Sequence, residues 1–144
     1  MFPSKYKDNS ENSTGLLFMR VFNKWHSIIK KELKKLDITQ PQFVVLTSLA
    51  YLLQKEDEVT QIMLSKISGI DVMTISQIIN LLEKNGFIKR KQHSKDTRAN
   101  SVFLTLKGQN ILEKAVPLVE NIDDNFFNIL AEKEQLFREL LKKL

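Results

Sequence analysis

Residues with hydrogen-bonding side chains line one side of a helix predicted over residues 72–85. At about 100° per residue, the side chains that share this exposed arc are Met73, Ser76, Gln77, Asn80 and Lys84. Amide groups can form paired hydrogen bonds with adenine, hydroxyl groups are adaptable, and a methionine methyl group can contact the methyl group of thymine. A solvated helix face usually carries more lysine–glutamate pairs. The stripe therefore suits the base edges in a DNA major groove.

A basic segment follows this helix directly. Residues 84–107 contain seven basic residues and one acidic residue, a net charge of +6, whereas the whole chain has a formal charge of +5. Cationic side chains neutralise DNA phosphates, and this supplies the salt-dependent part of binding. The side chains expected to be available to phosphates are Lys84, Lys89, Arg90, Lys91, Lys95 and Arg98. The nearby His93 is expected to be a minor phosphate or solvent group.

Asp96 and Arg98 form a more specific pair within the basic segment. Residues two apart in an extended strand share a face, so the carboxylate of Asp96 can orient the guanidinium of Arg98. An oriented arginine at a loop tip is what insertion into a minor groove requires. The pair therefore predicts minor-groove contact.

Start and stop signals divide the chain before this segment into helices. Apolar residues at helical spacing begin at Leu16 and continue for about 20 residues. The residues that can cap or end the next three helices are Thr39, Thr60, Gly69, Asp71 and Gly86. Two short helices joined by a glycine-containing turn are typical of a helix-turn-helix.

The apolar pattern beyond the helix-turn-helix changes to that of strands. Strands are predicted over 87–91 and 102–106, joined by a polar tip. Helical spacing resumes at residue 107 and continues past Pro117, which is expected to kink the helix. A last helix is predicted over 132–144. The expected fold class is mainly α with a small β-hairpin wing, the winged helix-turn-helix plan.

The composition excludes several other kinds of site. The chain has no cysteine and two histidines, His26 and His93, so no metal site, cofactor or cysteine chemistry is expected. The sequence offers no nucleophile beside a base and no phosphate-binding glycine loop, so an enzyme is not expected. The longest apolar run, Leu49–Leu53, is too short for a membrane span, and the amino-terminal segment is unlike a signal peptide. A cytoplasmic protein is expected.

Over about residues 36–130 the chain resembles the MarR family of bacterial transcriptional regulators. The matching stretches are Leu36–Leu46, Thr60–Ile67, Thr74–Gly86 and Asp96–Gly108. The last stretch is the most specific, because an Asp-x-Arg wing followed by Val-x-Leu-Thr and glycine is a signature of the family. Two residues depart from the usual pattern. Ser65 replaces an alanine and should only perturb packing. Ala131 replaces a capping serine or threonine, so the last helix should start late or fray.

The resemblance implies a homodimeric regulator, expected to be a repressor, that binds a palindromic double-stranded DNA operator. In this single domain of residues 1–144, helices at about 14–36 and 107–144 would join the subunits. Residues from about 39 to 106 would form the winged-helix DNA-binding lobe, and the protein would be nucleoid-associated when bound. The full set of expected DNA contacts is Met73, Thr74, Ser76, Gln77, Asn80, Lys84, Lys89, Lys91, Lys95, Asp96 and Arg98.

The resemblance also implies that a small aromatic or phenolic effector relieves repression by binding between the dimer helices and the winged helix. Phe22, Trp25 and His26 are the candidate pocket residues. Aromatic residues at helical spacing are more often core or dimer contacts, so both interpretations stay open. The alternative function is a winged helix used only for protein contact, for which an oriented Arg98 would have no evident use.

Overall fold

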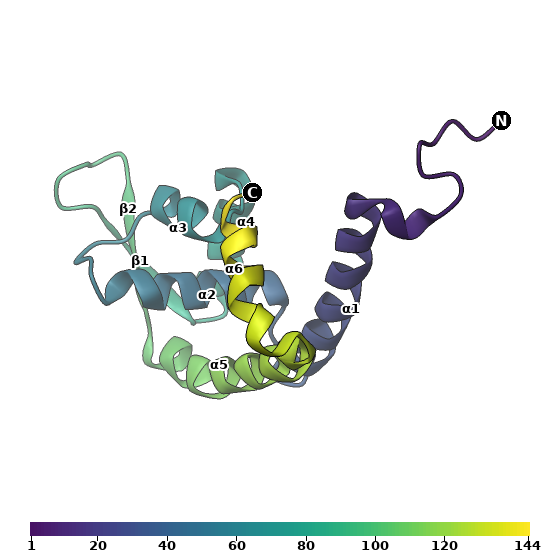
Figure 1. The fold of residues 1–144 in the computed structure, drawn as a ribbon. Coiled ribbons are helices and arrows are strands. Elements are labelled where there is room, and N and C mark those ends of the chain that lie inside the picture. Colours follow the sequence, from purple (N-terminus) through teal and green to yellow (C-terminus); the bar gives the residue numbers. More distant parts are fainter.

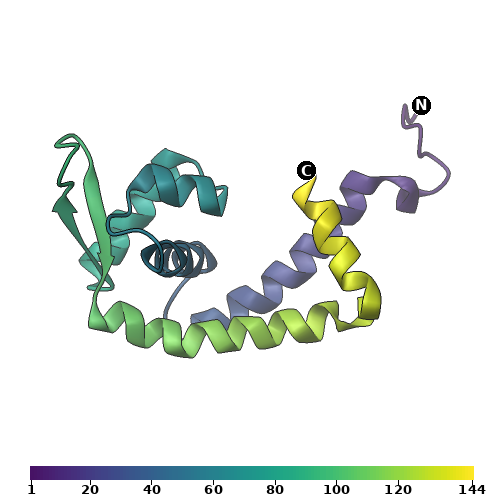
Figure 2. The same ribbon diagram turned by 60° about the vertical axis from the view of Figure 1, so that its left-hand side comes forward.

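The computed structural model describes residues 1–144 as helices and one two-stranded antiparallel sheet. The elements are η1 (Ser10–Asn12), α1 (Thr14–Lys34), α2 (Gln40–Leu53), α3 (Gln61–Ser68), α4 (Val72–Lys84), β1 (Ile88–Gln92), β2 (Asn100–Leu104), α5 (Leu106–Phe127), η2 (Asn128–Lys133) and α6 (Glu134–Lys142). Helices α2 to α4 and the hairpin form one lobe, while α1 and α6 lie apart from the hairpin (Figure 1). Figure 2 shows α5 running from this lobe to the end where α6 begins. The winged-helix prediction is confirmed.

Local side-chain caps set the helix starts. Thr39 and Gln42 form the complete capping box at the start of α2, with each side chain bonded to the other residue's backbone N–H. The hydroxyl of Thr60 accepts a bond from the N–H of Met63, and the carboxylate of Asp71 accepts one from Thr74. Gly69 ends α3 with φ 74°, a left-handed conformation that favours glycine. The predicted caps are confirmed.

The core fills the inside of the lobe and extends to α5 and the end of α1. Its fully buried side chains come from several elements, including Leu33 of α1, Leu46 of α2, Ile79 of α4 and Val102 of β2. The predicted apolar side of α4 is buried in full: Ile75, Ile78, Ile79 and Leu82. Burial of this side holds α4 with its opposite side facing solvent.

The turn after α4 packs against the first turn of α5. The backbone N–H of Thr105 donates to the carbonyl of Phe87 at 3.1 Å, and the hydroxyl of Thr105 donates to the carbonyl of Gly86 at 2.6 Å. The ammonium of Lys107 donates to the carbonyl of Asn85 at 2.6 Å. A Cβ atom at Gly108 would lie 2.1 Å from the Phe87 carbonyl oxygen, so only glycine allows this approach. The end of α4 is thereby fixed to the start of α5.

The predicted strand ends were wrong by one to two residues. The strands cover Ile88–Gln92 and Asn100–Leu104, with Ile88 opposite Leu104 and Gln92 opposite Asn100. The second strand stops early because the Thr105 hydroxyl accepts a bond from the N–H of Gly108 and caps α5. Pairing instead extends toward the tip, which is shorter than predicted.

The carboxyl-terminal helices also differ in detail from prediction. Helix α5 continues past Pro117 to Phe127, as predicted. Helix α6 begins at Glu134 with no side-chain cap, after Ala131 adopts φ 50° and ψ −128°. The late start expected from Ala131 is confirmed. No single helix is long and apolar enough to cross a membrane; α3 and α4 reach that composition only together, with a bend of 112° between them.

Candidate nucleic-acid interface

The polar stripe of α4 lies on the solvent side of the helix. Met73 is 75% exposed, and Gln77, Asn80 and Lys84 are also exposed, while Ser76 is half-buried. Because the opposite side is buried, this stripe can approach another molecule without any change in the fold. Its side chains offer hydrogen-bond donors, acceptors and one methyl group, as base edges require.

Thr74 lies at the start of α4 and belongs to its cap. Its backbone N–H and its hydroxyl both donate to the carboxylate of Asp71, at 2.9 and 2.7 Å. These two hydrogen bonds lower the pKa of Asp71 because they favour its charged form. The Thr74 hydroxyl therefore has a partner within the protein, whereas the side-chain ends of the stripe residues have none.

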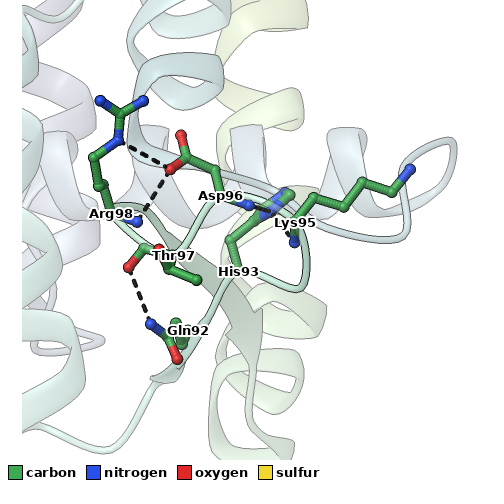
Figure 3. Close-up of polar contacts among 6 residues, drawn as sticks. All are labelled: Gln92, His93, Lys95, Asp96, Thr97 and Arg98. Carbon is green, nitrogen blue, oxygen red and sulfur yellow. Dashed lines mark hydrogen bonds and ion pairs between the residues drawn. The ribbon is translucent and has the colours of Figure 1, made fainter.

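The wing tip carries Arg98 on a turn. The Arg98 side chain is 91% exposed, and its Nε lies 3.4 Å from Oδ1 of Asp96 (Figure 3). The same Oδ1 accepts the backbone N–H of Arg98 at 3.0 Å. The expectation of an extended strand here was wrong: the N–H of Ala99 donates to the Asp96 carbonyl and closes a turn. Asp96 still contacts Arg98, because a turn also brings residues two apart together.

His93 organises the wing tip from inside. Its Nδ1 accepts the backbone N–H groups of Lys95 and Asp96, both at 3.1 Å (Figure 3). The amide of Gln92 donates to the carbonyl of Thr97 at 3.0 Å. The expectation that His93 is a minor phosphate or solvent group was wrong. Its Nδ1 accepts hydrogen bonds within the tip, and its Nε2 lies 3.2 Å from Oε2 of Glu58. The sequence gives no sign that the ring of His93 accepts these two backbone N–H groups.

The four lysines predicted to bind phosphates are exposed, whereas one of the two arginines, Arg90, is bound to a carboxylate of the protein. Lys84, Lys89, Lys91 and Lys95 extend into solvent. Arg90 instead pairs with Glu83, with Nη2 to Oε1 at 2.8 Å and Nε to Oε2 at 3.3 Å. The side-chain hydrogen bonds of this pair lower the pKa of Glu83 and raise that of Arg90, and the opposite charges act in the same direction. The expectation that Arg90 is available to phosphates was wrong.

The wing and the helix-turn-helix enclose a groove of about 560 Å³. Asp96 and Arg98 line it from the wing, and Thr60 and Gln61 line it from the start of α3. Ser65 stabilises the turn between α3 and α4, because its hydroxyl donates to the carbonyl of Ile70 at 2.5 Å. The expectation that Ser65 only perturbs packing was wrong. It adds a hydrogen bond across the α3–α4 turn.

The aromatic candidates for an effector pocket separate into two groups. Phe22 and Trp25 line a cavity of about 300 Å³, whose other lining residues are Phe18, Val21, Phe127, Phe137 and Leu141. His26 does not line it: the ring stacks on Phe22 at 5.4 Å between centroids and bonds to the side-chain oxygen of Gln40. Trp25 donates to Asp123 at 2.7 Å. Burial raises the pKa of Asp123. The hydrogen bond from Trp25 acts in the opposite direction, and the negative charge of Asp124 raises the pKa further.

Known proteins share this architecture and sequence. Residues 38–99 match the model of the MarR family. An uncharacterized HTH-type transcriptional regulator of Bacillus subtilis, YdcH, is 36% identical over 133 residues, covering 90% of each chain. A cysteine-to-serine mutant of MarR from E. coli, solved with operator DNA, has a TM-score of 0.79 and 28% identity, covering 90% of this chain and 91% of that one.

A second solved structure is Bordetella bronchiseptica BpsR, described with a mechanism for regulation of its DNA binding by 6-hydroxynicotinic acid. It has a TM-score of 0.77 and 26% identity, covering 90% of this chain and 96% of that one. These relatives are transcription regulators and not enzymes. The chain therefore belongs to the MarR family and is a DNA-binding transcriptional regulator.

Proposed function

We propose that the protein is a homodimeric repressor of a palindromic operator, with α4 in the major groove and Arg98 in the minor groove. The observation that carries this proposal is the exposed guanidinium of Arg98, held by Asp96 at the tip of a wing beside the α4 stripe. Met73, Ser76, Gln77 and Asn80 would contact base edges. The exposed lysines at positions 84, 89, 91 and 95 would contact phosphates.

Exposed apolar side chains on the terminal helices support a dimer. Helix α6 has no buried residue, and Leu136, Leu140 and Leu141 are exposed on it. Helix α1 exposes Leu16 and Phe18. A subunit with this much uncovered apolar surface is stabilised by burying it against a second copy. Residues 14–36 and 107–144 would form this interface, and two copies of the 39–106 lobe would occupy grooves about 34 Å apart.

An effector would act on the relative position of these lobes. We propose a small aromatic or phenolic compound as the effector, bound near Phe22 and Trp25 at the junction of α1, α5 and α6. BpsR, whose DNA binding is regulated by 6-hydroxynicotinic acid, supports this compound class. Such a ligand lowers operator affinity only if it binds more tightly to the dimer conformer in which the spacing of the two α4 helices does not match successive major grooves. Compounds that raise the melting temperature without changing operator affinity would contradict this part of the proposal.

Arg98→Ala tests the proposed minor-groove contact. Operator affinity should fall strongly, and more on sites with a narrow A-tract minor groove than on sites with a wide groove. Arg98→Lys is the matched control, because it keeps the charge but lacks the planar guanidinium. Gel shifts with excess competitor DNA measure both effects. Equal loss on all sequences would contradict minor-groove readout, and binding that competitor removes completely would favour the protein-contact alternative.

A further inference from the structure

The carboxylate of Glu58, in the loop between α2 and α3, lies against the wing tip. Its Oε1 accepts the backbone N–H of Ser94 at 3.0 Å, and its Oε2 accepts the Ser94 hydroxyl at 2.6 Å. The same Oε2 lies 3.2 Å from Nε2 of His93. The two bonds from Ser94 lower the pKa of Glu58, so the anchor is charged at neutral pH.

His93 carries this contact into the turn that holds Arg98. Nδ1 of the ring accepts the backbone N–H groups of Lys95 and Asp96, while Nε2, on the other side of the ring, lies 3.2 Å from Oε2 of Glu58. Asp96 in turn accepts the backbone and side-chain N–H groups of Arg98 (Figure 3). The contacts of Glu58 with Ser94 and His93, followed by the hydrogen bonds within the tip, therefore link the α2–α3 loop to the guanidinium of Arg98.

The tip has no other polar attachment to the lobe. Strand pairing ends at Gln92 and Asn100, and the remaining hydrogen bonds of residues 93–99 lie within the hairpin. Every hydrogen bond or ion pair that joins the tip to the rest of the protein comes from Glu58. One residue further along, the carbonyl of Val59 accepts the N–H of Val102 at 2.8 Å and holds the base of the wing.

We propose that Glu58 is a positioning residue for DNA readout, which fixes the wing tip so that Arg98 enters the minor groove in one orientation. This role rests on the proposed contact between Arg98 and DNA. A tip that is ordered before binding does not lose the entropy of ordering when the complex forms. The sequence does not show the contact, because 36 residues separate Glu58 from Ser94.

Glu58→Ala tests this role, with Glu56→Ala as the matched control. Glu56 is an exposed carboxylate two residues earlier in the same loop, without a side-chain partner, so both variants remove one negative charge from this loop. Affinity for a narrow-groove operator should fall about three- to tenfold in Glu58→Ala relative to Glu56→Ala. Ser94→Ala, which removes one of the hydrogen bonds, should give a smaller loss in the same direction. Equal affinities of Glu58→Ala and Glu56→Ala would overturn the proposal.

Two further readouts separate positioning from general damage. In the Arg98→Ala background, Glu58→Ala should cause no further loss, because the side chain to be positioned is gone. An additive loss would mean a structural role and would overturn the proposal. Limited trypsin digestion should cut faster after Lys95 and Arg98 in Glu58→Ala than in Glu56→Ala, at equal melting temperatures. If Arg98→Ala alone leaves affinity unchanged, the proposed minor-groove function fails, and faster digestion in Glu58→Ala still reports the anchor.

Discussion

Arg98 and Arg90 differ in how a neighbouring carboxylate places the guanidinium group. Both lie in the hairpin, but Asp96 holds Arg98 on the outside of a turn, while Glu83 draws Arg90 onto the end of α4. Glu83 binds both Nε and Nη2 of Arg90, so Arg90 loses two bonds if it moves to a phosphate, whereas Asp96 contacts only Nε of Arg98. Equal charge in one hairpin therefore does not mean equal access to DNA.

Asn80 is the residue of the stripe best suited to test base readout. Asn80→Ala should relax base preference by about 1–3 kcal/mol at one position in each half-site, because the paired hydrogen bonds of the amide are lost. Affinities for operators substituted at each base pair measure this effect. Asn110→Ala, which removes an exposed amide from α5, is the control and should leave every preference unchanged. Unchanged base preferences in Asn80→Ala would remove this residue from the readout.

Residues on one element were predictable, whereas pairs between elements were not. The 3.6-residue period placed Gln77 and Asn80 opposite the buried side of α4, and the structure exposes both. Glu83 and Arg90 are seven residues apart on different elements, and their contact depends on how β1 follows the turn. Periodicity carries no information about that geometry.

At the scale of the element, the cap of α4 makes stability depend on pH. Hydrogen bonds from Thr74 lower the folded-state pKa of Asp71. Its stabilising effect is complete above the unfolded pKa of about 3.9 and is lost as pH falls through the lower folded value. Asp71→Ala should therefore lower the free energy of unfolding at pH 6, and the difference from wild type should shrink below pH 3. Urea unfolding at each pH measures this, and a difference independent of pH would contradict it.

Gly108 tests the junction between α4 and α5. Gly108→Ala should destabilise the fold by about 1–3 kcal/mol, because the added Cβ would overlap the carbonyl of Phe87. Gly15→Ala is the control, because no atom lies within 4 Å of a Cβ at that helical position. Urea unfolding at one fixed protein concentration compares the two variants. Equal stabilities would mean that the close approach does not constrain the junction.

Helix starts were predictable because their signals are local, and strand ends were not. Thr39 with Gln42, and Asp71 with Thr74, are three residues apart, so the sequence shows both partners of each cap. The end of β2 depends on whether Thr105 continues the ladder or caps α5. Its hydroxyl also donates to Gly86, 19 residues earlier, and this long-range bond favours the cap.

At the scale of the whole molecule, α5 couples the two ends of the chain. Its first turn holds the end of α4 through Thr105 and Lys107, and Asp123 near its other end accepts the indole N–H of Trp25. Under the proposed function, a change in the packing of α1 against α5 would reach α4 through these contacts. This is the physical route by which a ligand near Trp25 would change the spacing of two lobes.

The proposed dimer predicts different effects for two exposed apolar residues. Leu140 of α6 and Tyr51 of α2 are 50% and 56% exposed. Leu140→Glu should shift the protein toward monomers, because it places a charge in an apolar interface, whereas Tyr51→Glu should leave the mass unchanged. Sedimentation velocity measures the mass of each variant. A dimeric Leu140→Glu variant would place the interface elsewhere.

Selection of bound fragments from random double-stranded DNA tests the central claim most directly. The purified protein, at physiological ionic strength, should enrich an inverted repeat whose half-sites are about 10 base pairs apart from centre to centre. Such a repeat would report two recognition helices related by two-fold symmetry. Enrichment of a single unpaired half-site, or of no sequence at all, would contradict the account.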